Sequence, residues 1–378
     1  MRGRGEGLAA VLAGGASGLL FAALVITGAL EPVDVAIYDR LFALRGPRSV
    51  TTPIVIVAID ETSITELSTF PFPRAMHGAL LDRLSMSGPL AVGIDLVFDT
   101  PSLRRAEDDE AFAAALLRAG NVVLAAAPTS EIVAGLRPYG LVDPHVPIPA
   151  IRAAARAVGT ASHEPGPDGR QRHTAVPLRM RNQTLPAFDA ALYQVARSAG
   201  LPAAPLPTTP RTLINFRGGP RTFPLFSYYR VVRGEIAPGA FRGKVVLVGA
   251  TSPLMHDMFA TPFAPTGDMP GIEIHANALE TLIRGNAIAE LPGVAAALAA
   301  LAAGVALGVL VARASRLAAP TSLVALVAVA GGTYVLFAYL DAWFRAAAPM
   351  LAIALALVLS IGAMQTASGG WRRSPPGR

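Results

Sequence analysis

Ile54-Val-Ile-Val-Ala-Ile59 is a run of six apolar residues in the first third of the sequence. A continuous run of this length, rich in β-branched side chains, predicts a strand that is buried on both faces. Ala91–Phe98 and Asn121–Leu124 predict a second and a third strand. Apolar residues at helical spacing over 74–87 and 107–118 separate the three strands. Alternation of strands and helices with short links predicts a parallel sheet with right-handed crossovers.

The region that follows predicts additional strands and helices. Val158–His163 and Arg172–Met180 flank Gly166-Pro-Asp-Gly169, which is typical of a β-hairpin with an Asp-Gly turn. The remaining elements that we expect are two strands, Thr212–Phe216 and Lys244–Val248, and two helices, Pro186–Ser198 and Met269–Gly285. The sequence therefore predicts an α/β domain with a mixed, largely parallel sheet, helices and a β-hairpin.

Four apolar runs lie outside this region: Leu8–Leu30, Gly293–Ala312, Leu317–Leu340 and Ala346–Ala367. Each is close to the ~20 residues that a helix needs to cross about 30 Å of hydrocarbon. Hydrophobic residues form 52% of the chain, charged residues only 15%, and the mean hydropathy is +0.47. We therefore expect four transmembrane α-helices and, over residues 31–291, an aqueous domain that carries almost all of the acidic residues.

The positions of arginine predict the orientation in the membrane. Arginines precede the first run, lie between the second and third runs, and follow the fourth run. Because short cytoplasmic segments are enriched in Arg and Lys, residues 1–7 and the tail 368–378 are expected in the cytoplasm and residues 31–291 outside it. The first run is longer than a signal-peptide core, and Thr27-Gly28-Ala29 is a poor cleavage site. We therefore expect an uncleaved anchor in a multi-pass protein of the inner membrane, with a periplasmic domain.

Composition argues against several kinds of function. The net charge is +6, but only Lys244 is lysine and the arginines are scattered, so we expect no nucleic-acid partner. The absence of cysteine excludes disulfides, thiolate chemistry and haem attachment. The six histidines form no zinc-binding spacing, and Gly249-Ala-Thr-Ser252 lacks the Gly-Lys-Ser/Thr ending of a phosphate loop. No Gly-x-Ser-x-Gly motif or other catalytic set occurs. We expect no cofactor, no metal and no enzymatic activity.

Polar residues near strand ends are the candidate ligand-binding residues. Asp60, Asp95 and Asp99 follow or end predicted strands, where open α/β sheets place their ligand crevice. Alternatively, Asp60 caps a helix and Asp95 pairs with an arginine such as Arg74. The other candidates are Arg74, the planar guanidinium groups of Arg172 and Arg217, which can bind a carboxylate or a phosphate, and Asn215, Thr251, His275 and Asn277. For His275 and Asn277, hydrogen bonding to the sheet is the competing interpretation.

Nine short motifs in a fixed order resemble one known family. They are Leu44-Arg-Gly-Pro47, Ile56-Val-Ala-Ile-Asp60, Pro71-Phe-Pro-Arg74, Val92-Gly-Ile-Asp-Leu-Val-Phe98, Gly120-Asn-Val-Val123, Asp168-Gly-Arg-Gln-Arg172, Ile214-Asn-Phe-Arg-Gly218, Gly243-Lys-Val-Val-Leu-Val-Gly-Ala-Thr251 and Pro270-Gly-Ile-Glu-Ile-His-Ala-Asn277. Over about residues 38–285 the chain is similar to the CHASE domain of the second type, a sensory extracellular domain associated with cyclases and histidine kinases. Family members usually have one helix before the domain and three after it.

The resemblance implies an extracytoplasmic sensor that relays an unknown stimulus through its membrane helices. Family members typically continue into a cyclase, a histidine kinase or a serine/threonine kinase, whereas only residues 368–378 follow the fourth apolar run here. The alternatives are a stand-alone sensor, a receptor truncated before its output domain, and a periplasmic scaffold for a protein partner. The expected partners are the lipid bilayer, a small-molecule or protein stimulus, and a second copy of the chain or a separately encoded kinase or cyclase.

Two pairs of glycines predict close packing of membrane helices. Gly14 and Gly18 lie four residues apart in the first run, and Gly304 and Gly308 have the same spacing in the second. This spacing lets helix backbones approach each other closely. Packing within one chain is favoured over dimerisation, and both interpretations remain open.

Overall fold

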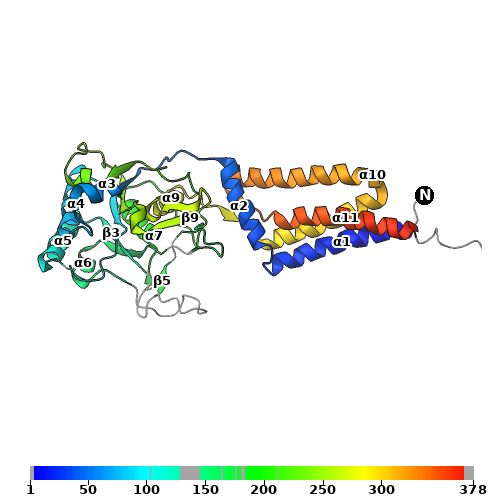
Figure 1. Ribbon diagram of the computed structural model, residues 1–378, viewed down its shortest axis with the longest axis horizontal. Helices are drawn as coiled ribbons and strands as arrows, with labels where there is room; N and C mark the ends of the chain where they lie inside the picture. Colours follow the sequence, from blue (N-terminus) through cyan, green and yellow to red (C-terminus); the bar gives the residue numbers. More distant parts are fainter. Residues whose placement is uncertain are drawn as a thin grey trace, which may run out of the picture. The chain divides into compact units, whose positions relative to one another are not determined.

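The computed structural model describes residues 4–102, 104–127, 145–162, 165–174, 177–179, 184–209 and 211–369. The chain divides into two compact units. The helical unit comprises Met1–Arg45 and Ile288–Arg378, and the α/β unit comprises Gly46–Ala287 (Figure 1). The boundary at Arg45 groups residues 31–45 with the helices, although the predicted aqueous domain begins at residue 31.

A six-stranded sheet forms the centre of the α/β unit. All of its pairings are parallel, and its strand order is β4-β3-β2-β8-β1-β7. The strands are β1 (Ile54–Ile59), β2 (Ala91–Ile94), β3 (Val122–Ala126), β4 (Ala157–Thr160), β7 (Leu225–Ser227) and β8 (Val245–Ala250). Every residue of β1 and β8 is buried, as expected for strands that are covered on both faces.

Helices cover both faces of the sheet. Val55 and Val57 of β1 belong to a core that includes helix side chains on one face, and Ile54 and Ile56 belong to a second core on the other. The first face is covered by α3 (Glu61–Leu67), α4 (Arg74–Ser87), α5 (Ala106–Ala119), α6 (Pro149–Ala154) and α8 (Tyr228–Val232), and the second by α7 (Phe188–Ser198) and α9 (Gly271–Arg284). Figure 1 shows α4 and α5 on one side of the strands and α7 and α9 on the other. The predicted α/β class and parallel sheet are confirmed.

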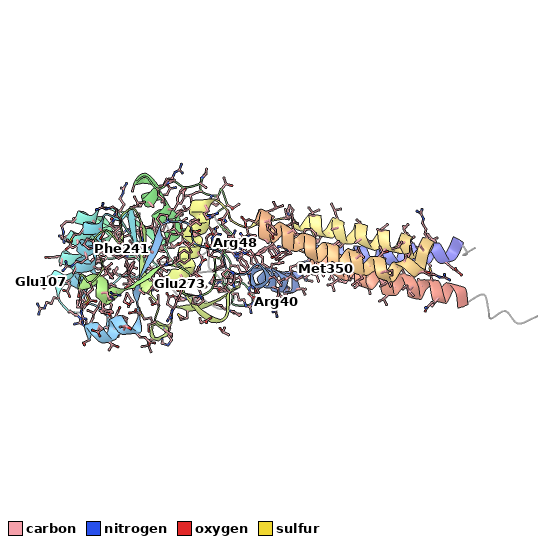
Figure 2. The ribbon with its side chains drawn as sticks, turned by 90° about the horizontal axis from the view of Figure 1, so that it is seen from above. Arg40, Arg48, Glu107, Phe241, Glu273 and Met350 are labelled. Carbon is pink, nitrogen blue, oxygen red and sulfur yellow. The ribbon has the colours of Figure 1, made fainter. Side chains whose placement is uncertain are left out.

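Packing separates interior from surface in this unit. Phe241 is only 2% exposed and belongs to the first core, whereas Glu107 at the start of α5 is exposed. Figure 2 shows Phe241 inside the α/β unit and Glu107 at its edge. Gly88 and Gly120 end α4 and α5 with φ of 68° and 66°, a left-handed conformation that glycine adopts without steric cost.

The position predicted for the β-hairpin is wrong. Its first half forms β4, which lies beside β3 in the main sheet. A hairpin is present elsewhere, between β9 (Met258–Thr261) and β10 (Ala264–Pro270), after the 3₁₀ helix η1 (Pro253–Met255). The short strands β5 (Leu178–Arg179) and β6 (Thr184–Leu185) also pair antiparallel.

The predicted strand at Thr212–Phe216 is also wrong. Only Leu213 forms an isolated bridge, with His173. Ile214 N donates to the carbonyl oxygen of Arg172 at 2.8 Å as part of this bridge. The next amide bonds to a side chain of α9 instead: Asn215 N donates to Thr281 Oγ1 at 3.0 Å. Because α9 satisfies the amide of Asn215, the bridge does not extend into a strand.

The helical unit contains α1 (Arg4–Ile26), α2 (Glu31–Arg45), α10 (Gly293–Leu340) and α11 (Ala347–Gly369), with short strands β11 (Ala289–Glu290) and β12 (Ala342–Trp343). Among the described residues, three helices are long and apolar enough to cross a membrane, over Gly5–Ile26, Gly293–Leu340 and Ala347–Thr366. The prediction of four separate helices is therefore wrong, because the second and third apolar runs form the 48-residue helix α10. Residues between the two runs stay helical apart from Ala314, at φ −147° and ψ 61°.

Helix α10 turns back on itself (Figure 1). If straight, its 48 residues would extend about 70 Å, more than twice the hydrocarbon thickness. Instead, β11 just before α10 pairs with β12 just after it, and Ala289 N donates to Asp341 O at 2.8 Å. Both ends of α10 therefore lie next to each other.

The two glycine pairs pack against each other within the chain. A Cβ atom added to Gly14 would lie 2.9 Å from Gly308 Cα, and one added to Gly18 would lie 2.8 Å from Leu301 Cα. A Cβ on Gly304 would lie 2.8 Å from Gly18 N. The four glycines thus allow α1 and α10 to approach at backbone distance.

Helix α2 joins the ends of the membrane-type helices. Asp34 is 2% exposed, and its carboxylate accepts a hydrogen bond of 3.0 Å from Ala347 N at the start of α11. Tyr38 packs edge-on against Phe337 of α10, with ring centroids 5.6 Å apart, and against Trp343, at 4.9 Å. These contacts explain why α2 belongs to the helical unit.

Candidate functional site

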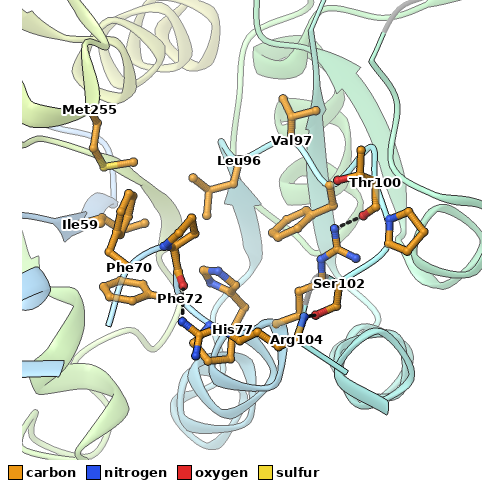
Figure 3. Close-up of a pocket in the computed structure, with 15 residues that line it drawn as sticks. Ile59, Phe70, Phe72, His77, Leu96, Val97, Thr100, Ser102, Arg104 and Met255 are labelled. Atoms are coloured by element: carbon orange, nitrogen blue, oxygen red, sulfur yellow. Dashed lines mark hydrogen bonds between the residues drawn. The ribbon is translucent and has the colours of Figure 1, made fainter. Parts of the chain in front are cut away.

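A cavity of about 320 Å³ lies at the carboxyl ends of β1 and β2, on the face that α4 covers. Its walls are mostly aromatic and aliphatic, and its principal lining residues are Phe70, Phe72, His77, Leu96, Phe98 and Met255 (Figure 3). The carboxyl edge of a parallel sheet is where open α/β folds bind ligands. The volume is at the small end of the range for ligand pockets.

The inner wall of the cavity is closely packed, and its rim is open. Phe72 stacks on Tyr228 with centroids 4.8 Å apart, and Phe72 and Phe98 are 6% and 5% exposed. At the rim, Phe70 and Val97 are 45% and 39% exposed. The cavity therefore combines a packed apolar interior with an apolar entrance.

His77 in the cavity wall carries no charge at neutral pH. Its Nδ1 lies 2.9 Å from the hydroxyl oxygen of Tyr228. Burial, and then the positive charge of Arg74, lower the pKa of His77 to about 4. His77 thus contributes a neutral ring to the wall.

Two arginines line the cavity, and their charges are balanced differently. Arg74 at the start of α4 forms an ion pair with Asp109 and also donates to the carbonyl of Thr100. Arg104 donates to Thr69 Oγ1 at 2.6 Å and to the carbonyl oxygen of Pro71 at 3.4 Å, both uncharged acceptors. In Figure 3 the side chain of Arg104 extends past His77 toward Phe72.

A buried charged cluster occupies the opposite face of the sheet. His275 of α9 is fully buried, and its Nδ1 lies 2.7 Å from Asp189 Oδ1 of α7, while its Nε2 lies 3.8 Å from Asp95 Oδ2. Burial by itself lowers the pKa of His275, but the charges of Asp189, Asp95 and Asp257 raise it to about 9. Burial raises the pKa of Asp95 to about 7, and it also raises that of Asp257. Across the described residues, no group of three or more His, Asp or Glu side chains has a geometry that would hold a metal ion.

The sequence-predicted residues at the strand ends do not converge on one site. The carboxylate of Asp60 caps α3 by accepting from Ser63 N at 2.7 Å, and it also accepts from Ser227 Oγ. Asp95 contacts His275 on the opposite face and does not pair with Arg74, whose partner is Asp109. Asp99 pairs with His145. Of the ten candidate residues, only Arg74 lines the main cavity.

Three further candidates attach α9 to the loop beside it. Arg217 N donates to Asn277 Oδ1 at 2.8 Å, and Asn215 Nδ2 donates to the carbonyl of Asn286 at 2.9 Å. The guanidinium of Arg217 is buried beside Glu280, with 3.2 Å between Nε and Oε1. These residues hold the unit together and do not line the cavity.

The last two candidates lie apart from these. Arg172 is 4% exposed and pairs with Asp168 at 2.5 Å, which lowers the pKa of that carboxyl to about 2. Thr251 follows β8, and its N donates to the carbonyl of Ile59 at 3.1 Å. Neither residue lines the cavity.

Sequence reasoning missed most of the cavity residues. The Pro71-Phe-Pro-Arg74 motif pointed to the region, but it did not indicate that Phe70 and Phe72 would line a cavity. Arg104 was not distinguished from other charged residues near a helix start. Asp189 and Asp257 were missed because their relation to His275 exists only in three dimensions.

Residues 16–311 match the CHASE2 domain family. This range includes the whole α/β unit and parts of α1 and α10. The chain belongs to the CHASE2 domain family. The resemblance inferred from the nine motifs is thereby confirmed, and no catalytic family accompanies the match. No curated protein and no solved structure shows a significant match to this CHASE2 chain.

Proposed function

We propose that this CHASE2 protein is a membrane-bound sensor whose α/β unit lies outside the cytoplasm and relays a stimulus through its membrane helices. The observation that carries the proposal is the CHASE2 match, which extends from the α/β unit into the apolar helices on both sides of it in sequence. A sensory domain joined at both ends to membrane-type helices is the arrangement expected of a receptor.

The orientation rests on charge. Arg313 and Arg316 lie at the turn of α10, and the two ends of α10 lie together at β11 and β12. Helix α10 therefore crosses the membrane twice, with its arginine-bearing turn in the cytoplasm. The ends of α10, and with them the last residue of the α/β unit, Ala287, then lie on the extracytoplasmic side of an inner membrane.

The relay would run from α9 to α10. Residues 285–292 connect the two helices, and α9 is buried against β1 and β8 of the sheet. A ligand that binds two states of the α/β unit with different affinity shifts their populations by that difference in free energy. Shifted packing of α10 against α1 would carry the signal to a second copy of the chain or to a separate kinase or cyclase.

Reporter fusions test the orientation. A reporter active only in the periplasm should work when fused after Ala150 in α6 and fail when fused after Arg316. A reporter active only in the cytoplasm should give the reverse pattern. Cytoplasmic activity at position 150 would contradict an extracytoplasmic sensor.

A further inference from the structure

The charge lining the cavity is entirely basic. Fifteen residues line it, among them Arg74 and Arg104, and none of these described lining residues is aspartate or glutamate. The neutral ring of His77 adds no charge at neutral pH. A cationic ligand would find no carboxylate here, whereas an anionic ligand would find a guanidinium.

Arg104 is the guanidinium that has capacity for a ligand. Arg74 is held by Asp109, and the side chains of both are about one-tenth exposed, at 11% and 12%. Arg104, by contrast, uses one terminal nitrogen for two neutral oxygens, and no carboxylate pairs with it in the part of the chain that the structure describes. Because a guanidinium carries five donors in a planar fork, most of the donors of Arg104 remain available for an anion.

The geometry points to a small carboxylate with an aromatic or branched apolar body as the ligand of this cavity. The body would fill the space between Phe72, Leu96 and Phe98, and the carboxylate would lie at the rim against Arg104. This assignment deepens the proposed sensor function, since it names the class of stimulus for the same α/β unit.

The single charge of a carboxylate fits better than a phosphate. Only one guanidinium in the cavity lacks an acidic partner among the described residues, so one negative charge can be matched there and a second cannot. The cavity volume of about 320 Å³ accommodates a single ring with a short side chain.

Calorimetric titration of the full-length protein in lipid nanodiscs tests the assignment. The probes are 3-phenylpropionate, its neutral analogue 3-phenylpropanamide, and propionate, which lacks the ring. We expect 3-phenylpropionate to bind about tenfold or more tightly than either of the others, because a charge-assisted hydrogen bond and the apolar contacts are both needed.

Three variants test the roles of the Arg104 charge and of the cavity space. Arg104→Gln should weaken binding of 3-phenylpropionate about tenfold to hundredfold and leave the amide unchanged. Arg105→Gln removes the same charge one residue away, from a side chain that does not line the cavity, and should bind like the unmodified protein. Leu96→Trp fills the cavity and should abolish binding, with circular dichroism confirming that each variant is folded.

Three results would overturn the assignment. They are no binding of 3-phenylpropionate at millimolar concentration, equal affinity for the amide, and equal losses in Arg104→Gln and Arg105→Gln. Each would reject the ligand class and leave the reporter test of orientation unaffected. Conversely, a cytoplasmic α/β unit would reject the sensor orientation without changing the titration.

Discussion

The backbone contact between α1 and α10 should not tolerate side chains at the glycine pairs. A Cβ on Gly14 would lie 2.9 Å from Gly308 Cα, whereas ordinary contacts of a Cβ begin at 3.4 Å. Even a methyl group therefore requires the helices to separate by at least about 0.5 Å, because the carbonyl oxygen of Gly304 would lie closer still, and isoleucine requires more. Because the opposing atoms are backbone, they cannot move without displacing the helix.

The expected cost follows from this overpacking. Forcing extra atoms into a packed interface costs about 1–3 kcal/mol per site. Gly14 and Gly18 face the same helix, so their effects will not be additive. A loss of 1.4 kcal/mol lowers the ratio of packed to separated helices about tenfold.

A disulfide introduced between the two helices measures the packed state. The chain has no cysteine, so a pair placed at Gly7 and Ala312 has no background. A Cβ on Gly7 would lie 3.6 Å from the Cβ of Ala312, within the range that disulfides require. In membranes treated with an oxidant, this pair should cross-link within one chain and migrate as a monomer.

Adding Gly14→Ile and Gly18→Ile should slow that cross-linking at least about fivefold. Gly331→Ile and Gly332→Ile are the matched control, because no atom lies within 4 Å of a Cβ at either position. An unchanged rate in the Gly14/Gly18 variant would refute the packing argument. A cross-linked dimer would place the contact between two chains.

Two further predictions concern stability, measured by thermal unfolding of the full-length protein in detergent. Asp34→Ala removes the carboxylate that accepts a hydrogen bond from Ala347 N and should lower the free energy of unfolding by about 1 kcal/mol. The control Glu31→Ala changes an exposed position of α2 and should lower it by less than half as much. Equal losses in the two variants would contradict a capping role for Asp34. The pKa of His275 is raised from 6.5 to about 9. The stabilisation of the folded state by the protonated ring is therefore complete below pH 6.5 and is lost as the pH rises through 9. The free energy of unfolding should fall by at most about 3 kcal/mol over this range. His275→Gln should remove that part of the pH dependence, and an unchanged decline would exclude His275 as its source.

The sequence predicted the sheet because its strands are buried on both faces. Ile54–Ile59 and Val245–Ala250 have only apolar residues or glycine in their cores, and this local pattern is enough to indicate a central strand. The pattern at Thr212–Phe216 looked similar but misled, because the amide of Asn215 bonds to the side chain of Thr281 in α9, which is distant in sequence. Such long-range hydrogen bonds leave no local signal.

For the membrane helices, too, the local sequence pattern was predictive and the longer-range structure was not. All four apolar runs were visible, but the continuity of α10 was not, since only Ala314 departs from helical geometry between the second and third runs. The cavity was less predictable still. Arg104 is positioned at the cavity by hydrogen bonds to Thr69 and Pro71, which are more than thirty residues away in sequence.

A sensor must change the packing of its membrane helices when a ligand binds its α/β unit. A distance measurement between spin labels tests this most directly. Leu12→Cys on α1 and Val324→Cys on α10 replace side chains that are 64% and 66% exposed, so labels there should not disturb packing. We expect saturating 3-phenylpropionate to shift the distance distribution between these labels in nanodiscs, and the shift to be absent in Arg104→Gln. Bound 3-phenylpropionate with an unchanged distribution would contradict relay through the membrane helices.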